Sequence, residues 1–180
     1  MRYFLMVILF MFPGFLSGQP NATSTIAADT VMTVATCQSR IIKSKLRINN
    51  KKFVDTEPVM LQIQNGNNEY GIVQTGKCQD KIFFYFKVMV NNVCLKNQEA
   101  IELYYDNGKI RILQNEFPVN CEGNFVRILS KREVRAIREN KIRMIRLYTF
   151  RKDYLFALKD SEYTAIAQGL QCLRKYRFRR

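Results

Sequence analysis

The chain has 180 residues, with 29 Lys and Arg, 15 Asp and Glu and no His, so its formal net charge is +14 at pH 7. The absence of His excludes Ser-His-Asp and Cys-His catalysis, His-ligated zinc and a His proton shuttle. Hydrophobic residues make up 47% of the chain, which is the composition of a basic globular protein.

The first 18 residues predict a signal peptide. Arg2 supplies the positive charge, residues 4–12 form an apolar run, and Pro13-Gly14 interrupts it. This run is too short to cross a bilayer core of about 30 Å, and no later stretch approaches the length of a spanning helix. We therefore expect cleavage before Gln19 and an exported protein, whether periplasmic, cell-surface or secreted.

The remaining chain divides into three parts. Residues 19–35 are rich in Thr, Ala and Asn with little periodicity, which predicts a flexible leader. Residues 36–173 are long enough for a single domain with one core. Residues 174–180 contain five basic and two aromatic side chains and predict a basic tail.

Strands are predicted first along the chain, at residues 41–48, 59–63, 70–73 and 82–90, with a turn around Gly76. The continuous apolar character of residues 82–90 predicts a central strand that is buried on both faces. Further strands are predicted at residues 101–105, 110–113, 124–129, 142–150 and 154–158.

A hairpin is predicted around Asn107-Gly108, because this dipeptide favours a two-residue type I′ turn. With that loop Leu103 faces Ile112. The same register, extended outward, brings Cys94 opposite Cys121, and we predict a disulfide between them.

Three cysteines remain, namely Cys37, Cys78 and Cys172. Export favours disulfides, so a second pair among these three is possible. At least one thiol is then left free or pairs outside the chain. A buried, unreactive thiol is favoured over a reactive one, since no basic motif lies beside any of them.

Two helices are predicted in the last third of the chain. Ser130 and Glu133 form a capping box at the start of a helix that ends near Asn140. Asp160 or Ser161 caps a second helix that ends near Arg174. The order of elements predicts an α+β fold, in which a mostly antiparallel sheet carries one or two helices on one face.

Positive charge is concentrated in residues 127–180, which contain 16 basic and 5 acidic side chains. Clustered Lys and Arg favour a polyanion, an anionic membrane surface or a protein partner, whereas the alternative is an ordinary solvated face. The candidate anion contacts are Lys131, Arg132, Arg135, Arg138, Arg143, Arg146, Arg174, Lys175, Arg177, Arg179 and Arg180.

No sequence motif for a nucleotide, a metal or a small-molecule cofactor is present, and none of these ligands is expected. A hydrolase that works without His would need a carboxylate pair, such as Asp153 with Asp160, or a Ser-Lys pair such as Ser130 with Lys131. Ser130 is better explained as a helix cap.

Five short motifs lie between about residue 80 and residue 173: Val93-Cys94-Leu95, Asp106-Asn107-Gly108, Asn120-Cys121-Glu122-Gly123, Ile145-Arg146-Leu147-Tyr148-Thr149 and Leu170-Gln171-Cys172-Leu173. With these motifs the chain resembles small exported proteins of unknown function that are common in Bacteroidetes. The resemblance implies a periplasmic or cell-surface protein and implies no activity, cofactor or catalytic residue.

The sequence thus predicts an exported, non-enzymatic binding or interaction module whose basic C-terminal third contacts an anionic partner. The alternative is a structural or assembly protein that acts through sheet edges or an intermolecular disulfide. A His-independent hydrolase is the third hypothesis.

Overall fold

The fold was examined in a computed structural model, which describes residues 37, 40–48, 51–64, 69–95, 100–118 and 121–178. The predicted signal peptide (residues 1–18) and leader (residues 19–35) lie outside these residues, as do Arg179 and Arg180.

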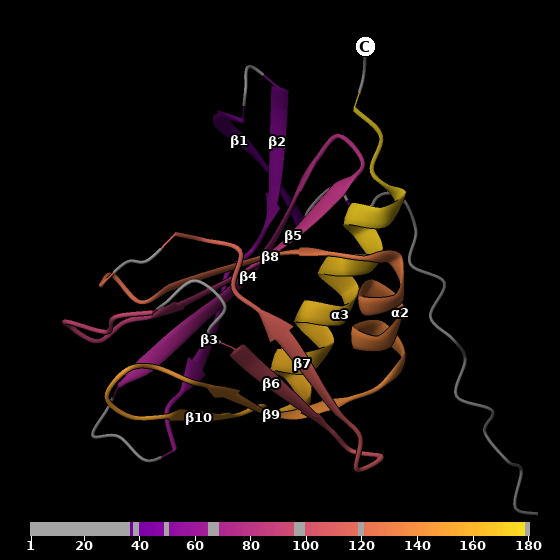
Figure 1. Cartoon of the computed structure of the whole chain (residues 1–180). Helices are drawn as coiled ribbons and strands as arrows, with labels where there is room; N and C mark the ends of the chain where they lie inside the picture. Colours follow the sequence, from indigo (N-terminus) through magenta and orange to yellow (C-terminus); the bar gives the residue numbers. More distant parts are fainter. Residues whose placement is uncertain are drawn as a thin grey trace, which may run out of the picture. The chain divides into compact units, whose positions relative to one another are not determined.

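The larger of two sheets is antiparallel, and its strands follow the order β1-β2-β4-β5-β8, with β3 also paired to β4. Figure 1 shows β4, β5 and β8 running diagonally across the molecule, with the strands of the smaller sheet below them. Of its strands, β2 was not predicted. The strands are β1 (Ile41–Ile48), β2 (Lys51–Thr56), β3 (Val59–Gln62), β4 (Tyr70–Cys78), β5 (Lys81–Val88) and β8 (Asn124–Leu129).

Strands β2 and β3 share one edge of β4 and are separated by Glu57-Pro58. Pro has no N–H to donate to a ladder. The Thr56 hydroxyl compensates: it accepts from the Thr75 backbone N–H at 3.2 Å and lies 3.1 Å from the Thr75 carbonyl oxygen, to which it donates. A side chain therefore continues the hydrogen bonding across the break.

The smaller sheet is also antiparallel, in the order β10-β9-β6-β7. Its strands are β6 (Ala100–Tyr105), β7 (Ile110–Gln114), β9 (Ile142–Leu147) and β10 (Tyr154–Ala157).

The two sheets meet along two seams. At one seam Ile63 forms a bridge with Phe156, and Gln64 N–H donates to the Leu155 carbonyl at 2.8 Å. At the other seam Glu116 N–H donates to the Val126 carbonyl at 2.8 Å. The sheets consequently enclose one hydrophobic core, in which buried side chains of both sheets and both helices are in contact.

The two helices are α2 (Lys131–Glu139) and α3 (Asp160–Lys175). The predicted capping box is present, because Glu133 N–H donates to Ser130 Oγ at 3.2 Å and the Glu133 carboxylate accepts from Ser130 N–H at 2.6 Å. The N-cap of α3 is Lys159, so both predicted caps, Asp160 and Ser161, lie inside the helix. Helix α3 begins one residue earlier than predicted because the Glu162 carboxylate accepts from Lys159 N–H at 2.7 Å.

Helix α3 packs against β3 and β4. Its Gly169 lies against Thr56 at the end of β2, where a Cβ would lie 2.9 Å from Thr56 Cγ2 and would force one of the two elements to shift. The predicted α+β architecture, with antiparallel sheets and helices in the C-terminal third, is confirmed.

Strand β5 is central, as predicted, but only one of its faces is fully buried. Phe84 and Phe86 are buried, whereas Phe83 and Tyr85 are partly exposed on the opposite face. Phe53 packs on that outer face, with its ring centroid 5.8 Å from Phe83 and 6.2 Å from Tyr85. An aromatic cluster instead of a second layer therefore shields this side, which explains the continuous apolar run.

The register of the β6–β7 hairpin differs from the prediction by one residue, because Leu103 pairs with Arg111 and not with Ile112. The loop has three residues: Tyr105 N–H donates to the Lys109 carbonyl at 3.0 Å, and Gly108 N–H donates to the Tyr105 carbonyl at 3.1 Å. Gly108 has a φ of 76°, which is typical of a type I turn followed by a glycine bulge.

Candidate functional site

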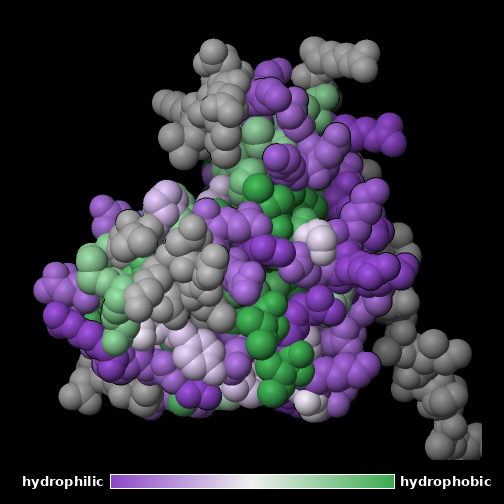
Figure 2. All heavy atoms as spheres, viewed as in Figure 1, coloured by the Kyte–Doolittle hydropathy of each residue, from purple (hydrophilic) through white to green (hydrophobic). Residues whose placement is uncertain are grey.

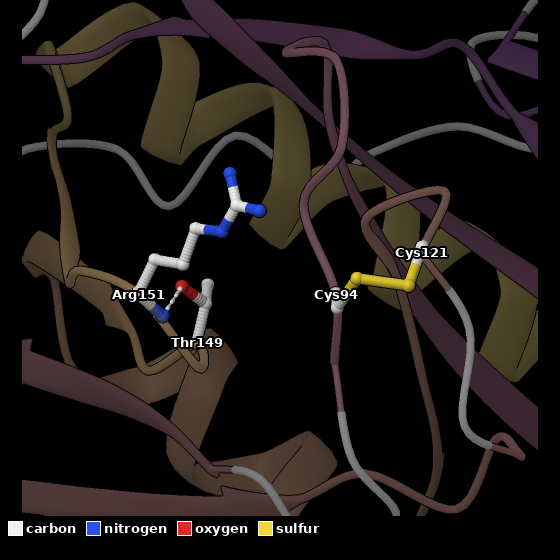
Figure 3. Close-up of a disulfide and its surroundings, with 4 residues drawn as sticks. All are labelled: Cys94, Cys121, Thr149 and Arg151. Atoms are coloured by element: carbon white, nitrogen blue, oxygen red, sulfur yellow. Dashed lines mark hydrogen bonds between the residues drawn. A yellow bond between two sulfur atoms is a disulfide. The ribbon is translucent and has the colours of Figure 1, made fainter.

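Both disulfides of the chain are found among the described cysteines. Cys94 and Cys121, the predicted pair, are bonded, with an S–S distance of 2.01 Å (Figure 3). The hairpin register does not bring them together. Instead, β5 and β8 are paired neighbours, and the Val88 N–H donates to the Gly123 carbonyl at 3.0 Å, so the segment between these strands begins and ends side by side.

The β9–β10 turn lies beside this disulfide. Phe150 N–H donates to the Cys94 carbonyl at 3.5 Å, and Thr149 Oγ1 accepts from Arg151 N–H at 3.4 Å within the turn (Figure 3). These are backbone and turn contacts, and they assemble no ligand-binding group.

The second disulfide joins Cys37 to Cys172 in the last turns of α3, and Cys78 is free and buried. Cys78 is 6% exposed, in agreement with the favoured interpretation of a buried thiol. The second pair is thus one of those left open by the sequence.

Six of the predicted anion contacts lie on α2 and β9, and we call this set the α2–β9 surface. It consists of Lys131, Arg132, Arg135, Arg138, Arg143 and Arg146.

Several charges of the α2–β9 surface are paired with carboxylates. Arg135 lies 3.4 Å from Glu139, and Arg146 donates to Asp153 at 2.5 Å, which raises the pKa of the Arg146 guanidinium. The Arg146 guanidinium also lies 4.6 Å from the centre of the Tyr148 ring.

The other members of this surface are held in different ways. Arg143 lies 3.9 Å from Asp160, whose main partner is Lys141 at 2.6 Å. Arg138 is partly buried, and burial together with the charge of Arg174 lowers the pKa of its guanidinium. On the α2–β9 surface, Arg135, Arg143 and Arg146 therefore each lie near a different carboxylate.

A cavity lies instead where the start of β2, the β4–β5 turn and the chain after α3 come together (Figure 1). Its volume is about 610 Å³, and we call it the basic groove. The lining residues are Lys51, Lys52, Lys77, Gln79, Asp80, Arg174, Tyr176, Arg177 and Phe178.

Of the predicted contacts that the structure describes, Arg174 and Arg177 line this groove, and Lys175 is exposed at the last position of α3. Lys51 and Lys52 come from a strand that was not predicted. They lie in the first two thirds of the chain, where charges nearly balance, so counting charge by segment missed them.

One wall of the groove is formed by the start of β2 and the β4–β5 turn. Gln79 has a φ of 54°, the left-handed conformation that reverses the chain directly after Cys78. Its side-chain oxygen accepts from Lys51 Nζ at 3.0 Å, which ties the start of β2 to the turn.

The floor of the groove contains Lys77, which is 8% exposed. Its ammonium donates to the backbone carbonyls of Leu173 at 2.9 Å and of Tyr176 at 2.8 Å. Burial lowers the pKa of Lys77, and the nearby Asp80 carboxylate opposes this shift. The carbonyls at the end of a helix carry partial negative charge, so Lys77 offsets a field that would otherwise repel an anion.

The other wall is the chain that follows α3. Tyr176 and Phe178 are partly buried against the core, and their rings meet edge to face with centroids 5.1 Å apart. Helix α3 continues through Lys175, one residue past the start of the predicted basic tail, and Lys77 holds the carbonyls of Leu173 and Tyr176.

The groove is strongly positive overall. Among its lining residues within the described part of the chain, five side chains are cationic and one, Asp80, carries a carboxylate. Because a concave surface focuses the field of the charges around it, this arrangement attracts anions more effectively than the same charges on a convex surface.

The residues considered for hydrolysis have other contacts. The Ser130 hydroxyl accepts a backbone N–H as a helix cap, Asp153 binds Arg146, and Asp160 binds Lys141. Within the described ranges, no group of three or more metal-ligating side chains is found, and no helix is long and apolar enough to span a membrane.

No family model, curated protein or solved structure matches the chain. The function of the basic groove therefore has to be inferred from its own geometry.

Proposed function

We propose that the protein is an exported, non-enzymatic binding module that holds an anionic partner in the basic groove. One observation carries this proposal: Lys51 and Lys52 on one wall converge with Arg174 and Arg177 on the other, although they are far apart in the sequence.

The electrostatics of the groove support this function. Lys77 neutralises the end of α3, so an anion between the walls meets cations without the opposing field of the helix. Release of counterions from a polyanion would then supply much of the binding free energy and make it depend on salt. The two disulfides are typical of proteins in an oxidising compartment, which is consistent with export.

The test is a salt titration of the full chain binding to fluorescein-labelled dextran sulfate, followed by fluorescence anisotropy. The groove variant combines Lys51→Gln with Arg177→Gln, one residue from each wall. The matched control combines Lys131→Gln with Arg132→Gln on the α2–β9 surface, which removes the same net charge.

We expect the groove variant to bind dextran sulfate about tenfold more weakly than the control. The slope of the logarithm of the binding constant against the logarithm of the salt concentration should become shallower by about 0.7–0.9 for each of the one to two anion contacts that the variant loses. Equal weakening in both variants would mean that total charge, and not the groove, drives binding. Absence of binding by the unaltered chain at low salt would reject the function.

A second candidate, assembly through a sheet, is favoured by β7. Ile110 is 55% exposed and Ile112 is 60% exposed, and they share one face of this strand. Figure 2 shows a largely hydrophilic surface in which hydrophobic side chains emerge along a central strip. The alternative form, an inter-chain disulfide, would require Cys78, which is buried.

Light scattering over a range of protein concentrations separates the two candidates. Self-association that is lost in Ile110→Ser/Ile112→Ser would support assembly. A monomer at all concentrations, with polyanion binding intact, would leave the groove as the functional surface.

A further inference from the structure

We infer that the ligand of the basic groove is a segment of an anionic glycan, a chain of sugar units that carry sulfate, carboxylate or phosphate groups. This inference rests on the proposed function and names the class of anion.

The size of the groove favours a chain over a single ion. A volume of about 610 Å³ falls within the range of about 300–1,000 Å³ that is usual for sites of drug-sized ligands. A lone phosphate would leave most of this volume to water and would contact only some of the cations. A segment with several charged groups can reach both walls at once.

The aromatic residues favour a ligand that has apolar faces as well as charges. Tyr176 and Phe178 line the groove together with Arg174 and Arg177. The face of an aromatic ring carries partial negative charge and attracts polarised C–H groups, which sugar rings present on their faces. Acidic substituents at the edges of the same sugar are then directed toward the cations.

The geometry of these rings disfavours single-stranded nucleic acid. Proteins that bind such strands offer ring faces on which successive bases stack. Here the planes of the two rings are 83° apart, so Tyr176 and Phe178 do not form two parallel platforms.

The location of the charges disfavours a membrane surface. Peripheral membrane proteins direct Lys and Arg outward from a face that lies on the lipid headgroups. In this protein Lys51, Lys52, Arg174 and Arg177 surround a cavity.

The experiment measures the affinity of the full chain for four probes in 150 mM salt. They are a heparin-derived hexasaccharide, linear polyphosphate and an oligothymidylate matched in charge, and vesicles of phosphatidylcholine with phosphatidylserine. We expect the hexasaccharide to bind about tenfold more tightly than polyphosphate, which has no ring to place on the aromatic wall, and than oligothymidylate, whose successive bases need parallel ring faces that Tyr176 and Phe178 do not offer. We expect vesicle binding to be the weakest.

The variant Tyr176→Leu/Phe178→Leu keeps every charge and removes both rings. It should lose about tenfold in affinity for the hexasaccharide while its affinity for polyphosphate changes less than about twofold. The single variant Tyr176→Phe retains both aromatic rings and should bind the hexasaccharide as tightly as the unaltered chain. Phe117→Leu, which replaces an exposed aromatic outside the groove, is the matched control and should have no effect.

Because both rings pack partly against the core, thermal unfolding of each variant is measured alongside binding. Preserved polyphosphate affinity provides a second check that the groove remains folded.

Polyphosphate or oligothymidylate binding as tight as the hexasaccharide, with no effect of Tyr176→Leu/Phe178→Leu, would overturn the glycan inference and leave the anion-binding function intact. Tighter binding to vesicles would replace the glycan with a membrane. Failure of all four probes to bind at any salt concentration would reject the proposed function itself.

Discussion

The basic groove and the α2–β9 surface are built from the same residue types, but they differ in what surrounds each charge. On the α2–β9 surface Arg135 and Arg146 lie beside carboxylates of their own, Glu139 and Asp153. In the groove, cations from two distant segments share one cavity with a single acidic residue. The difference leads us to expect an anion site where cations converge across the fold, and not where charge is merely dense along the sequence.

The largest expected effect concerns the disulfide between Cys37 and Cys172, which anchors the C-terminal end of α3. Cys37 and Cys172 are 135 residues apart in sequence, so opening this bridge by Cys37→Ser/Cys172→Ser should lower the free energy of unfolding by about 5 kcal/mol. Urea denaturation provides the measurement.

The control is Cys94→Ser/Cys121→Ser, whose bridge spans 27 residues and whose loss should lower the free energy of unfolding by about 3.5 kcal/mol. Only the first variant should also weaken dextran sulfate binding, because Cys172 lies in the last turns of α3. Equal effects on binding would mean that the groove depends on global stability alone.

The next effect comes from reversing charge on one wall. Arg174→Glu/Arg177→Glu should reduce dextran sulfate affinity about 100-fold, because two contacts are lost and two repulsions are introduced. Lys131→Glu/Arg132→Glu makes the same change of net charge on the α2–β9 surface and should cost about threefold. Anisotropy titrations at 50 mM salt measure both. If the second pair proves as damaging as the first, the distinction between the two regions fails.

A smaller effect is expected at the floor of the groove. Lys77→Met keeps an unbranched side chain that matches the apolar part of Lys but leaves the carbonyls of Leu173 and Tyr176 without their donor. We expect a loss of about 1–3 kcal/mol in the free energy of unfolding.

Dextran sulfate affinity of Lys77→Met should also fall by about tenfold, since the helix end is no longer neutralised. The control is Lys175→Met, which removes an exposed ammonium at the end of α3. It should leave the free energy of unfolding unchanged and reduce dextran sulfate affinity less than about threefold. Unchanged binding in Lys77→Met would show that this ammonium only supports packing.

The smallest effect lies on β2, away from the groove lining. Burial raises the pKa of the Asp55 carboxyl from 3.8 to about 6, so the folded state binds a proton that the unfolded state releases between these two values. Stability from this group is present at acidic pH and is lost as pH rises through about 6.

Asp55→Asn should therefore raise the free energy of unfolding by about 1–2 kcal/mol at pH 7 and change it little at pH 3. Urea denaturation at both pH values measures the difference. Dextran sulfate binding should be unaffected, which separates the stability of β2 from the charge of the groove. A gain in the free energy of unfolding of the same size at pH 3 and pH 7 would mean that ionisation of the buried Asp55 carboxyl is not its cause.

Local chemistry predicted much of the fold. The capping box at Ser130 and Glu133 and the hairpin around Asn107-Gly108 depend on neighbouring residues, and both elements are present. The hairpin register was wrong because Asn-Gly is compatible with two loop lengths, and here Asp106 joins the loop.

Long-range packing decided what the sequence did not reveal. Gly76 was predicted to mark a turn, but it lies within β4, where a Cβ would be 2.5 Å from Phe53 Cζ. The predicted Cys94–Cys121 pair is present although the register argument for it failed, because the β5–β8 pairing closes the same segment. The basic groove was not predicted, since it requires Lys51, Lys77 and Arg177 to meet in space.

The outer edge of β8 has a consequence for how the protein behaves when crowded. Val126 N–H donates to Asn115 Oδ1 at 3.0 Å, and Ile128 N–H donates to the Glu116 carboxylate at 3.1 Å. These backbone donors are thereby withheld from strands of neighbouring molecules, which is how natural sheets avoid edge-to-edge aggregation. A polyanion gathers many copies of a basic protein along its length. Because these β8 donors are already bonded, molecules held close together on a polyanion need not pair their larger sheets edge to edge.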